Sequence, residues 1–297
     1  MMEGRSKLIE LQNGYRVWTR QVGTGEMPIL LLHGGPGANH EYLECLKDHI
    51  PLDRFRLYFY DQLGSYFSDQ PDDKTLWTVQ RFCDEVDEVR QALGIEQMIL
   101  FGQSWGGMLA IEYALKYGPH LKGLVISNMV ASIQSYVTHL NLLRSCLPQS
   151  AQDEMAFYET TQEYTHPRYL AIMDGLYKEH LCRLDPWPMA VVRSFEHLNP
   201  EVYETMQGPN EFFVTGTFKD WDRWADLDKI ATPSLLIGSR HDTMNPDDVL
   251  HMARRMPDAQ AVICPLGSHM AMWDDPEHYY PPLLDFLSTV SASNLNM

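Results

Sequence analysis

A Gly-x-Ser-x-Gly pattern at residues 102–106 places Ser104 between two glycines. The apolar run 98–101 precedes the pattern, and a segment with helical character, 108–117, follows it. A strand, a tight turn and a helix in this order lift a serine hydroxyl clear of a sheet. The glycines two positions before and after avoid clashes with neighbouring backbone. The pattern therefore predicts a nucleophilic serine at position 104.

A serine hydroxyl needs a general base, and the base needs a third group to orient it. Asp242 follows the apolar run 234–238, and His269 follows the apolar run 261–264. Both residues would then lie at carboxyl ends of strands, where ligands bind in open α/β sheets. The order Ser, Asp, His along the chain is that of the strand–turn–helix hydrolases. We predict a catalytic triad of Ser104, Asp242 and His269.

Other histidines and acids compete for these roles. His241 adjoins the predicted acid and would point away from it, whereas His251 and His278 fall on predicted helices. Asp247 and Asp248 open the helix expected near 246–255, where they would complement the helix dipole.

A glycine-rich loop, His-Gly-Gly-Pro-Gly at 33–37, directly follows the apolar run 27–32. In this position a loop supplies a backbone N–H to the oxyanion that forms during acyl transfer. We assign the two donors of the oxyanion hole to Gly35 and Trp105. The alternative is an ordinary glycine-rich turn. His33 is expected to hold the loop through hydrogen bonds rather than to react.

Short apolar runs alternate with helical patterns along most of the chain, which predicts a doubly wound α/β sheet. Runs that read as buried strands of a parallel sheet lie at 27–32, 57–60, 98–101, 124–127, 234–238 and 261–264. Residues 15–22 read as an antiparallel strand at the sheet edge. We predict an α/β-hydrolase fold with a mostly parallel sheet, in which residues 1–129 and 226–297 form the core. Residues 130–225, rich in helical patterns and aromatic side chains, are expected to form an inserted helical cap.

The charge of the chain indicates which kinds of partner the protein can bind. The 297 residues include 23 Lys and Arg against 40 Asp and Glu, a formal charge of −17. Such a surface repels phosphate backbones and anionic lipid, so we expect neither a nucleic-acid nor a membrane partner. The charge serves solubility or, alternatively, attracts amine-bearing substrates. No metal or organic cofactor is implied, and the oligomeric state stays open.

Five cysteines, an odd number with no CxxC pair and no zinc spacing, favour free thiols in a reducing compartment. The first residues lack the apolar stretch of a signal peptide, and the longest apolar runs are too short to span a bilayer. We expect a cytoplasmic protein.

Several motifs together resemble the proline iminopeptidase family. They are HGGPG at 33–37, DQLG at 61–64, GQSWGG at 102–107, GPNEF at 208–212, Asp242 with Pro246, and SHMAMWDDPE at 268–277. The resemblance runs from about residue 8 to residue 290. The stretch 206–222 looks closest to the tricorn-interacting aminopeptidases and the L-amino-acid amidases.

The resemblance implies a serine hydrolase that cleaves the amide bond after the N-terminal residue of a short peptide, or an amino-acid amide, through an acyl-enzyme. It assigns recognition of the free amine to Glu211, with Tyr203 as a neighbour in the pocket. Thr243 departs from the family pattern, since many relatives have Glu beside the catalytic Asp. An esterase, a lactonase or an acyltransferase on a substrate without a free amine is therefore the alternative, and a binding protein on this fold is a third hypothesis.

Overall fold

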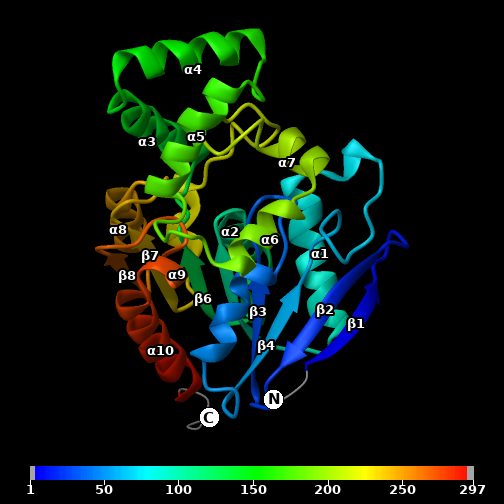
Figure 1. Ribbon diagram of the computed structural model, residues 1–297. Helices are drawn as coiled ribbons and strands as arrows, with labels where there is room; N and C mark the ends of the chain where they lie inside the picture. The colour runs from blue at the N-terminus through cyan, green and yellow to red at the C-terminus, as the bar shows by residue number, and fades with distance from the viewer. Residues whose placement is uncertain (1–3, 293–297) are drawn as a thin grey trace.

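The computed structural model describes residues 4–292, and a single eight-stranded sheet lies at the centre of this part (Figure 1). The strands are β1 Arg5–Glu10, β2 Arg16–Val22, β3 Met27–Leu32, β4 Phe55–Tyr60, β5 Met98–Gln103, β6 Leu121–Ser127, β7 Ser234–Ser239 and β8 Ala259–Cys264. Their order is β1-β2-β4-β3-β5-β6-β7-β8. The pairs β1–β2 and β2–β4 are antiparallel, and the others are parallel. The predicted α/β-hydrolase fold is confirmed.

Helices cover both faces of the sheet. They are α1 Val79–Ala92, α2 Trp105–Tyr117, α3 Ile133–Ser145, α4 Gln149–Thr161, α5 Pro167–His180, α6 Met189–Glu196, α7 Pro200–Met206, α8 Pro246–Arg255, α9 Ala271–Asp274 and α10 Pro276–Ala292. A 3₁₀ helix, η1, spans Glu41–Asp48, and a second, η4, spans Trp224–Lys229. Helix α2 packs on β3, β5 and β6, while α10 packs on β6, β7 and β8.

The apolar runs of the strands are explained by two separate cores. In β3, Leu30 and Leu32 belong to the core shared with α1, α2 and α8, whereas Ile29 and Leu31 belong to the core shared with η1 and α10. Because successive side chains of a strand point to opposite faces, a sheet with two covered faces needs apolar residues at every position.

Two expectations are wrong at the edges of the sheet: that residues 15–22 form an edge strand, and that residues 261–264 form a buried strand. The strand predicted at 15–22 is not an edge, because β1 pairs along its outer side, with Arg5 opposite Gln21. Strand β1 buries only Ile9, so it lacks the apolar run by which the other strands were found. The run at 261–264 lies in β8, which is the opposite edge and buries only Cys264.

Helices α3 to α7 form an insert between β6 and β7, and Figure 1 shows α3, α4 and α5 as a lobe above the carboxyl ends of the parallel strands. The two ends of this insert lie side by side. The amide of Ile133 donates to the carbonyl of Trp221 (2.9 Å), and the amide of Arg223 donates to the carbonyl of Ala131 (2.8 Å). The chain therefore leaves and rejoins the core at one place.

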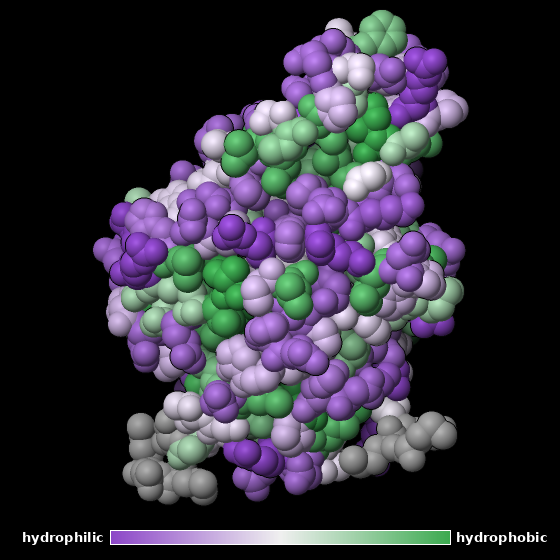
Figure 2. Space-filling model, turned by 60° about the vertical axis from the view of Figure 1, so that its left-hand side comes forward, coloured by the Kyte–Doolittle hydropathy of each residue, from purple (hydrophilic) through white to green (hydrophobic). Residues whose placement is uncertain are grey.

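Hydrophilic residues cover much of the face shown in Figure 2, and hydrophobic residues form patches between them. This distribution agrees with the excess of acidic residues in the sequence. Within residues 4–292, no helix is both long enough and apolar enough to cross a membrane.

Candidate active site

Ser104 lies on the sharp turn between β5 and α2, with φ 57° and ψ −126°. This backbone conformation is strained for a residue with a side chain. A Cβ on Gly102 would lie 2.0 Å from the carbonyl oxygen of Gly106, and a Cβ on Gly106 would lie 2.1 Å from that of Leu32. Only glycine fits at either position, so the pattern is a packing requirement of the turn.

Asp242 and His269 meet behind this turn, from the loops after β7 and β8. The Nδ1–H of His269 donates to Oδ1 of Asp242 (2.7 Å), and both side chains are buried. Asp242 also accepts hydrogen bonds from the side-chain amide of Asn128 (2.7 Å) and the backbone amide of Met244 (3.1 Å). Asn128 was not predicted, although it follows β6 directly, at the edge of the sheet where functional residues gather.

The reactive atoms of the site are uncommitted. Within the described residues, neither Oγ of Ser104 nor Nε2 of His269 makes a hydrogen bond, yet both residues line one cavity. In structures without substrate, hydrogen bonds between catalytic groups are often long or absent, and they form when substrate binds. Burial alone would lower the pKa of His269, but the charge of Asp242 and its hydrogen bond, together with the charges of Glu211 and Asp274, raise that pKa above its usual value.

The backbone amides of Gly35 and Trp105 are also uncommitted: neither donates a hydrogen bond to another group of the described chain. Both residues line the space beside Ser104. Gly35 has φ +112°, a conformation that a side chain would oppose. Two free N–H groups beside a serine are the donors that an oxyanion requires.

His33 holds the glycine-rich loop. Its Nδ1 donates to the carbonyl of Gly34 (2.8 Å), and its Nε2 accepts from the amide of Gln62 (3.0 Å). Complete burial lowers the pKa of His33 to about 4, which keeps the ring neutral. Gln62 in turn accepts a hydrogen bond from the indole of Trp105 (2.8 Å).

A second chain of hydrogen bonds joins the same loop to His269. The hydroxyl of Tyr42 accepts from the amide of Gly34 (2.6 Å) and donates to Oε1 of Gln103 (2.7 Å). The Nε2 of Gln103 donates to the carbonyl of His269 (3.0 Å). Gln103 is the variable residue before the serine, so the pattern gave no reason to select it. It fixes the base and the loop relative to each other.

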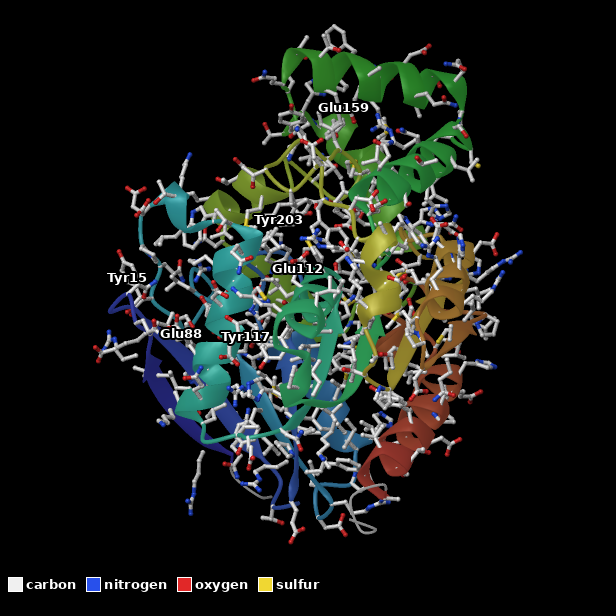
Figure 3. The ribbon with its side chains drawn as sticks, turned by 180° about the vertical axis from the view of Figure 1, so that it is seen from behind. Tyr15, Glu88, Glu112, Tyr117, Glu159 and Tyr203 are labelled. Atoms are coloured by element: carbon white, nitrogen blue, oxygen red, sulfur yellow. The ribbon has the colours of Figure 1, made fainter. Side chains whose placement is uncertain are left out.

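Glu211 enters the site from the loop after α7. Its carboxylate accepts hydrogen bonds from the hydroxyls of Tyr136 (2.6 Å), Thr243 (3.2 Å) and Tyr203 (3.4 Å). Burial and the charge of Glu211 hold the pKa values of both tyrosines well above the usual value, so these hydroxyls stay protonated donors. In Figure 3, Tyr203 lies between Glu159 in the lobe and Glu112 on α2. Tyr136 belongs to no motif of the sequence and was not predicted.

Thr243 lies where the family resemblance led us to expect a second carboxylate. Its hydroxyl is 3.2 Å from Oε1 of Glu211, 3.3 Å from Oδ1 of Asp242 and 3.3 Å from Nδ1 of His269. The side chain therefore joins the acid–base pair to Glu211.

The lobe fixes the loop that carries this carboxylate. The guanidinium of Arg144 pairs with Glu159 (2.6 Å) and donates to the carbonyl of Phe212 (3.1 Å). The hydroxyl of Tyr169 donates to Glu159 (3.2 Å) and accepts from the side-chain amide of Asn210 (2.8 Å). Residues of α3, α4 and α5 thus converge on one loop.

The cavity at Ser104 has two parts, which share Gly35, Ser104 and Glu211. One part, called the outer chamber because Phe195 in its wall is 39% exposed, is also bordered by Gly34, Ala38, Tyr42, Gln103, Leu181, Ser194, Phe195, Leu198, Tyr203, His269 and Met270. The other part, called the inner chamber, is also bordered by a set of buried residues: Trp105, Met108, Met129, Ile133, Tyr136, Gln207, Phe218 and Met244. An apolar cavity with a few convergent polar groups is typical of a small-ligand site.

The fold and this arrangement define a class, the serine hydrolases of the α/β-hydrolase fold. A family model described as "alpha/beta hydrolase fold" matches residues 27–276.

Comparison with known proteins narrows the class. A proline iminopeptidase of Flavobacterium johnsoniae is 40% identical over 287 residues, which cover 95% of this chain and 97% of the relative. The crystal structure of a proline iminopeptidase of Mycobacterium smegmatis superposes with a TM-score of 0.90 at 31% identity, covering 98% of this chain and 100% of that one. The crystal structure of VinJ superposes with a TM-score of 0.91 at 33% identity, covering 96% and 99%. The chain belongs to the proline iminopeptidase family.

Proposed function

We propose that this serine hydrolase removes the N-terminal residue, proline in the first instance, from short peptides and amino-acid amides through an acyl-enzyme. One observation carries the proposal: Glu211 borders both chambers beside Ser104, and its carboxylate contacts Tyr203 of the outer chamber and Tyr136 of the inner one. A carboxylate at this place binds the free amine of a substrate and so limits cleavage to the first residue. The name of the relatives supports proline as that residue.

The reaction begins when Oγ of Ser104 attacks the carbonyl carbon and its proton passes to Nε2 of His269. Asp242 keeps the imidazole in the tautomer that accepts at Nε2, and it stabilises the charged ring. The amides of Gly35 and Trp105 bind the developing oxyanion. The carbon–nitrogen bond then breaks, and His269 gives its proton to the leaving amine. Water, activated by His269, releases the acyl group and restores Ser104.

Amine recognition rests on one charge. A substrate ammonium would make a charge-assisted hydrogen bond to Glu211, which is stronger than a neutral one. The hydroxyls of Tyr136, Tyr203 and Thr243 orient the carboxylate. Most residues that border the inner chamber are apolar, Met108 and Phe218 among them, which agrees with binding of an apolar pyrrolidine ring. The alternative, an ester or lactone substrate without an amine, is favoured by the lack of a second carboxylate at Thr243.

The first test separates these two functions. Purified protein is assayed on prolyl and other aminoacyl arylamides beside p-nitrophenyl butyrate, with Ser104→Ala as the blank. We expect arylamide cleavage that depends on Ser104 and disappears when the amine is acetylated. Cleavage of the ester alone would contradict the proposed peptidase function and support the alternative, an esterase function.

A second test concerns Glu211 itself. Glu211→Gln keeps the shape of the side chain but removes its charge, so KM for aminoacyl arylamides should rise by about tenfold or more. The KM for p-nitrophenyl butyrate should change little, because this ester has no amine. Equal changes for the two substrates would assign Glu211 a structural role only.

We further propose that the protein works in the cytoplasm on small substrates, without a nucleic-acid or membrane partner. All five cysteines lie in the described part of the chain and are free thiols, which supports a reducing compartment.

A further inference from the structure

The two chambers can be assigned to the two halves of a substrate by the position of the general acid. In amide cleavage His269 must protonate the leaving nitrogen. Among the described residues that border the chambers, His269 borders the outer chamber and not the inner one. The leaving amine must therefore lie in the outer chamber, and the acyl residue in the inner one. This assignment rests on the proposed function.

The outer chamber presents an apolar wall to the leaving group. Leu181, Phe195, Leu198 and Met270 form it, and none of the described residues that border the chamber is Lys or Arg. The wall is held against the base, because the amide of His269 donates to the carbonyl of His180 (3.0 Å) and the amide of Met270 donates to that of Leu181 (2.9 Å).

The apolar surface continues from the chamber toward solvent. Phe195 is 39% exposed, and its ring centroid lies 5.6 Å from that of Trp187. The indole of Trp187 is fixed by its hydrogen bond to the carbonyl of Cys182 (2.9 Å). A leaving group longer than one residue would cover the exposed part of Phe195, and burial of that surface favours binding.

The arginines that lie nearest in sequence to the residues of this wall already form ion pairs with glutamates. Arg193, on the same helix as Phe195, contacts Glu41 (3.0 Å), and Arg183 contacts Glu179 (2.6 Å). The chamber wall itself carries the carboxylate of Glu211. A negatively charged leaving group would meet a carboxylate of like charge and no free cation, in a protein whose formal charge is −17.

We propose that the outer chamber is a leaving-group subsite for uncharged, apolar amines. The leaving group of a free dipeptide is an amino acid, whose carboxylate is attached one carbon from the scissile nitrogen and must enter this chamber. Peptide amides and longer peptides carry an uncharged amide there, and arylamides carry an uncharged aromatic ring. The enzyme therefore selects these substrates over free dipeptides.

The test compares matched pairs: prolyl-phenylalanine amide against prolyl-phenylalanine, and prolyl-glycine amide against prolyl-glycine. The kcat/KM of each amide should exceed that of its free acid by about tenfold or more, since like charges brought together are costly. Added salt should reduce this ratio, because it screens the repulsion. The phenylalanine amide should also exceed the glycine amide.

Two substitutions test whether residues of the outer chamber cause the preference for uncharged, apolar leaving groups. Phe195→Ala should reduce the preference for the phenylalanine amide over the glycine amide several-fold, and Leu198→Arg should reduce the discrimination against free acids. Phe157→Ala is the matched control, because Phe157 is an exposed aromatic (57%) on α4 that borders neither chamber. It should change neither ratio.

Failure of this inference can be told from failure of the proposed function. Cleavage of prolyl arylamides with equal kcat/KM for amides and free acids would overturn the subsite and leave the proposed function intact. Absence of any Ser104-dependent amide cleavage would overturn the proposed function, and the subsite with it.

Discussion

At the scale of single residues, the site is governed by the relation between Glu211 and His269. Thr243 contacts Glu211 as well as both members of the acid–base pair. The charge of Glu211 is among the causes that raise the pKa of His269. A bound ammonium would cancel part of this charge and make the imidazole easier to deprotonate. In the proposed mechanism, amine recognition by Glu211 and general-base catalysis by His269 are thus electrostatically coupled.

This coupling gives a prediction for pH dependence. The raised pKa of His269 means that the base is protonated up to a higher pH, so kcat/KM for p-nitrophenyl butyrate should fall on acidification with a midpoint above 6.5, the usual value. Glu211→Gln removes a negative neighbour, so the midpoint should move to lower pH. The measurement is the pH profile of kcat/KM for both proteins. A midpoint unmoved by the substitution would contradict the coupling.

Much at this scale was open to sequence reasoning. Ser104 was selected from the Gly-x-Ser-x-Gly pattern, and Asp242 and His269 were selected because each follows an apolar run of the predicted sheet. The structure brings Asp242 and His269 into contact. Tyr136 and Gln103 were not selected. Their roles depend on which turn of a helix, or which variable position of a motif, faces the cavity, and no local pattern specifies that.

At the scale of elements, the strand–turn–helix around Ser104 leaves no room for a side chain at Gly102 or Gly106. Gly106→Ala would drive a Cβ into the backbone of β3, since the built atom lies 2.1 Å from the carbonyl oxygen of Leu32. We expect a loss of about 2 kcal/mol or more in the free energy of unfolding, together with loss of activity. The measurement is urea unfolding beside the esterase assay.

Gly175→Ala is the matched control. Gly175 is exposed within α5, and nothing lies within 4 Å of a Cβ at this position. Stability should not fall by more than about 0.5 kcal/mol, because alanine is the better helix former, and activity should stay within about twofold of wild type. A similar loss in both variants would mean that alanine at a glycine position, and not the close backbone contact, is the cause.

The elements also divide by how well sequence reasoning found them. Strands β3 to β7 were found from their apolar runs, because both faces of the sheet are covered. Strand β1 was missed, since an edge strand that buries one residue in six has no such run. The convergence of Arg144, Glu159 and Tyr169 on one loop involves residues from three helices, and their pairing depends on tertiary packing rather than on sequence spacing.

At the scale of the whole molecule, a buried neutral histidine makes stability depend on pH. The pKa of His33 is about 4 in the folded protein and near 6.5 when exposed, so below pH 6.5 the unfolded chain binds the proton first. The stabilisation is complete above pH 6.5 and is lost as the pH falls toward 4. The loss from this residue approaches about 3 kcal/mol, given about 1.36 kcal/mol per pKa unit.

Urea unfolding at pH 7 and pH 4.5 measures this loss. His33→Gln should show a smaller drop between the two pH values than wild type, whatever its stability at pH 7. His251→Gln, at an exposed histidine of α8, should keep the wild-type drop. Equal drops in wild type and in the His33 variant would assign the acid sensitivity to other groups.

The closed base of the insert bears on how such proteins diversify. Two backbone hydrogen bonds join its ends, so residues 133–221 are attached to the sheet as a loop is attached at its stem. A segment tethered in this way can be lengthened, shortened or exchanged for another without moving the strands on either side. A change in the lobe could therefore alter selectivity, while Ser104, Asp242 and His269, which follow strands of the sheet, keep their places.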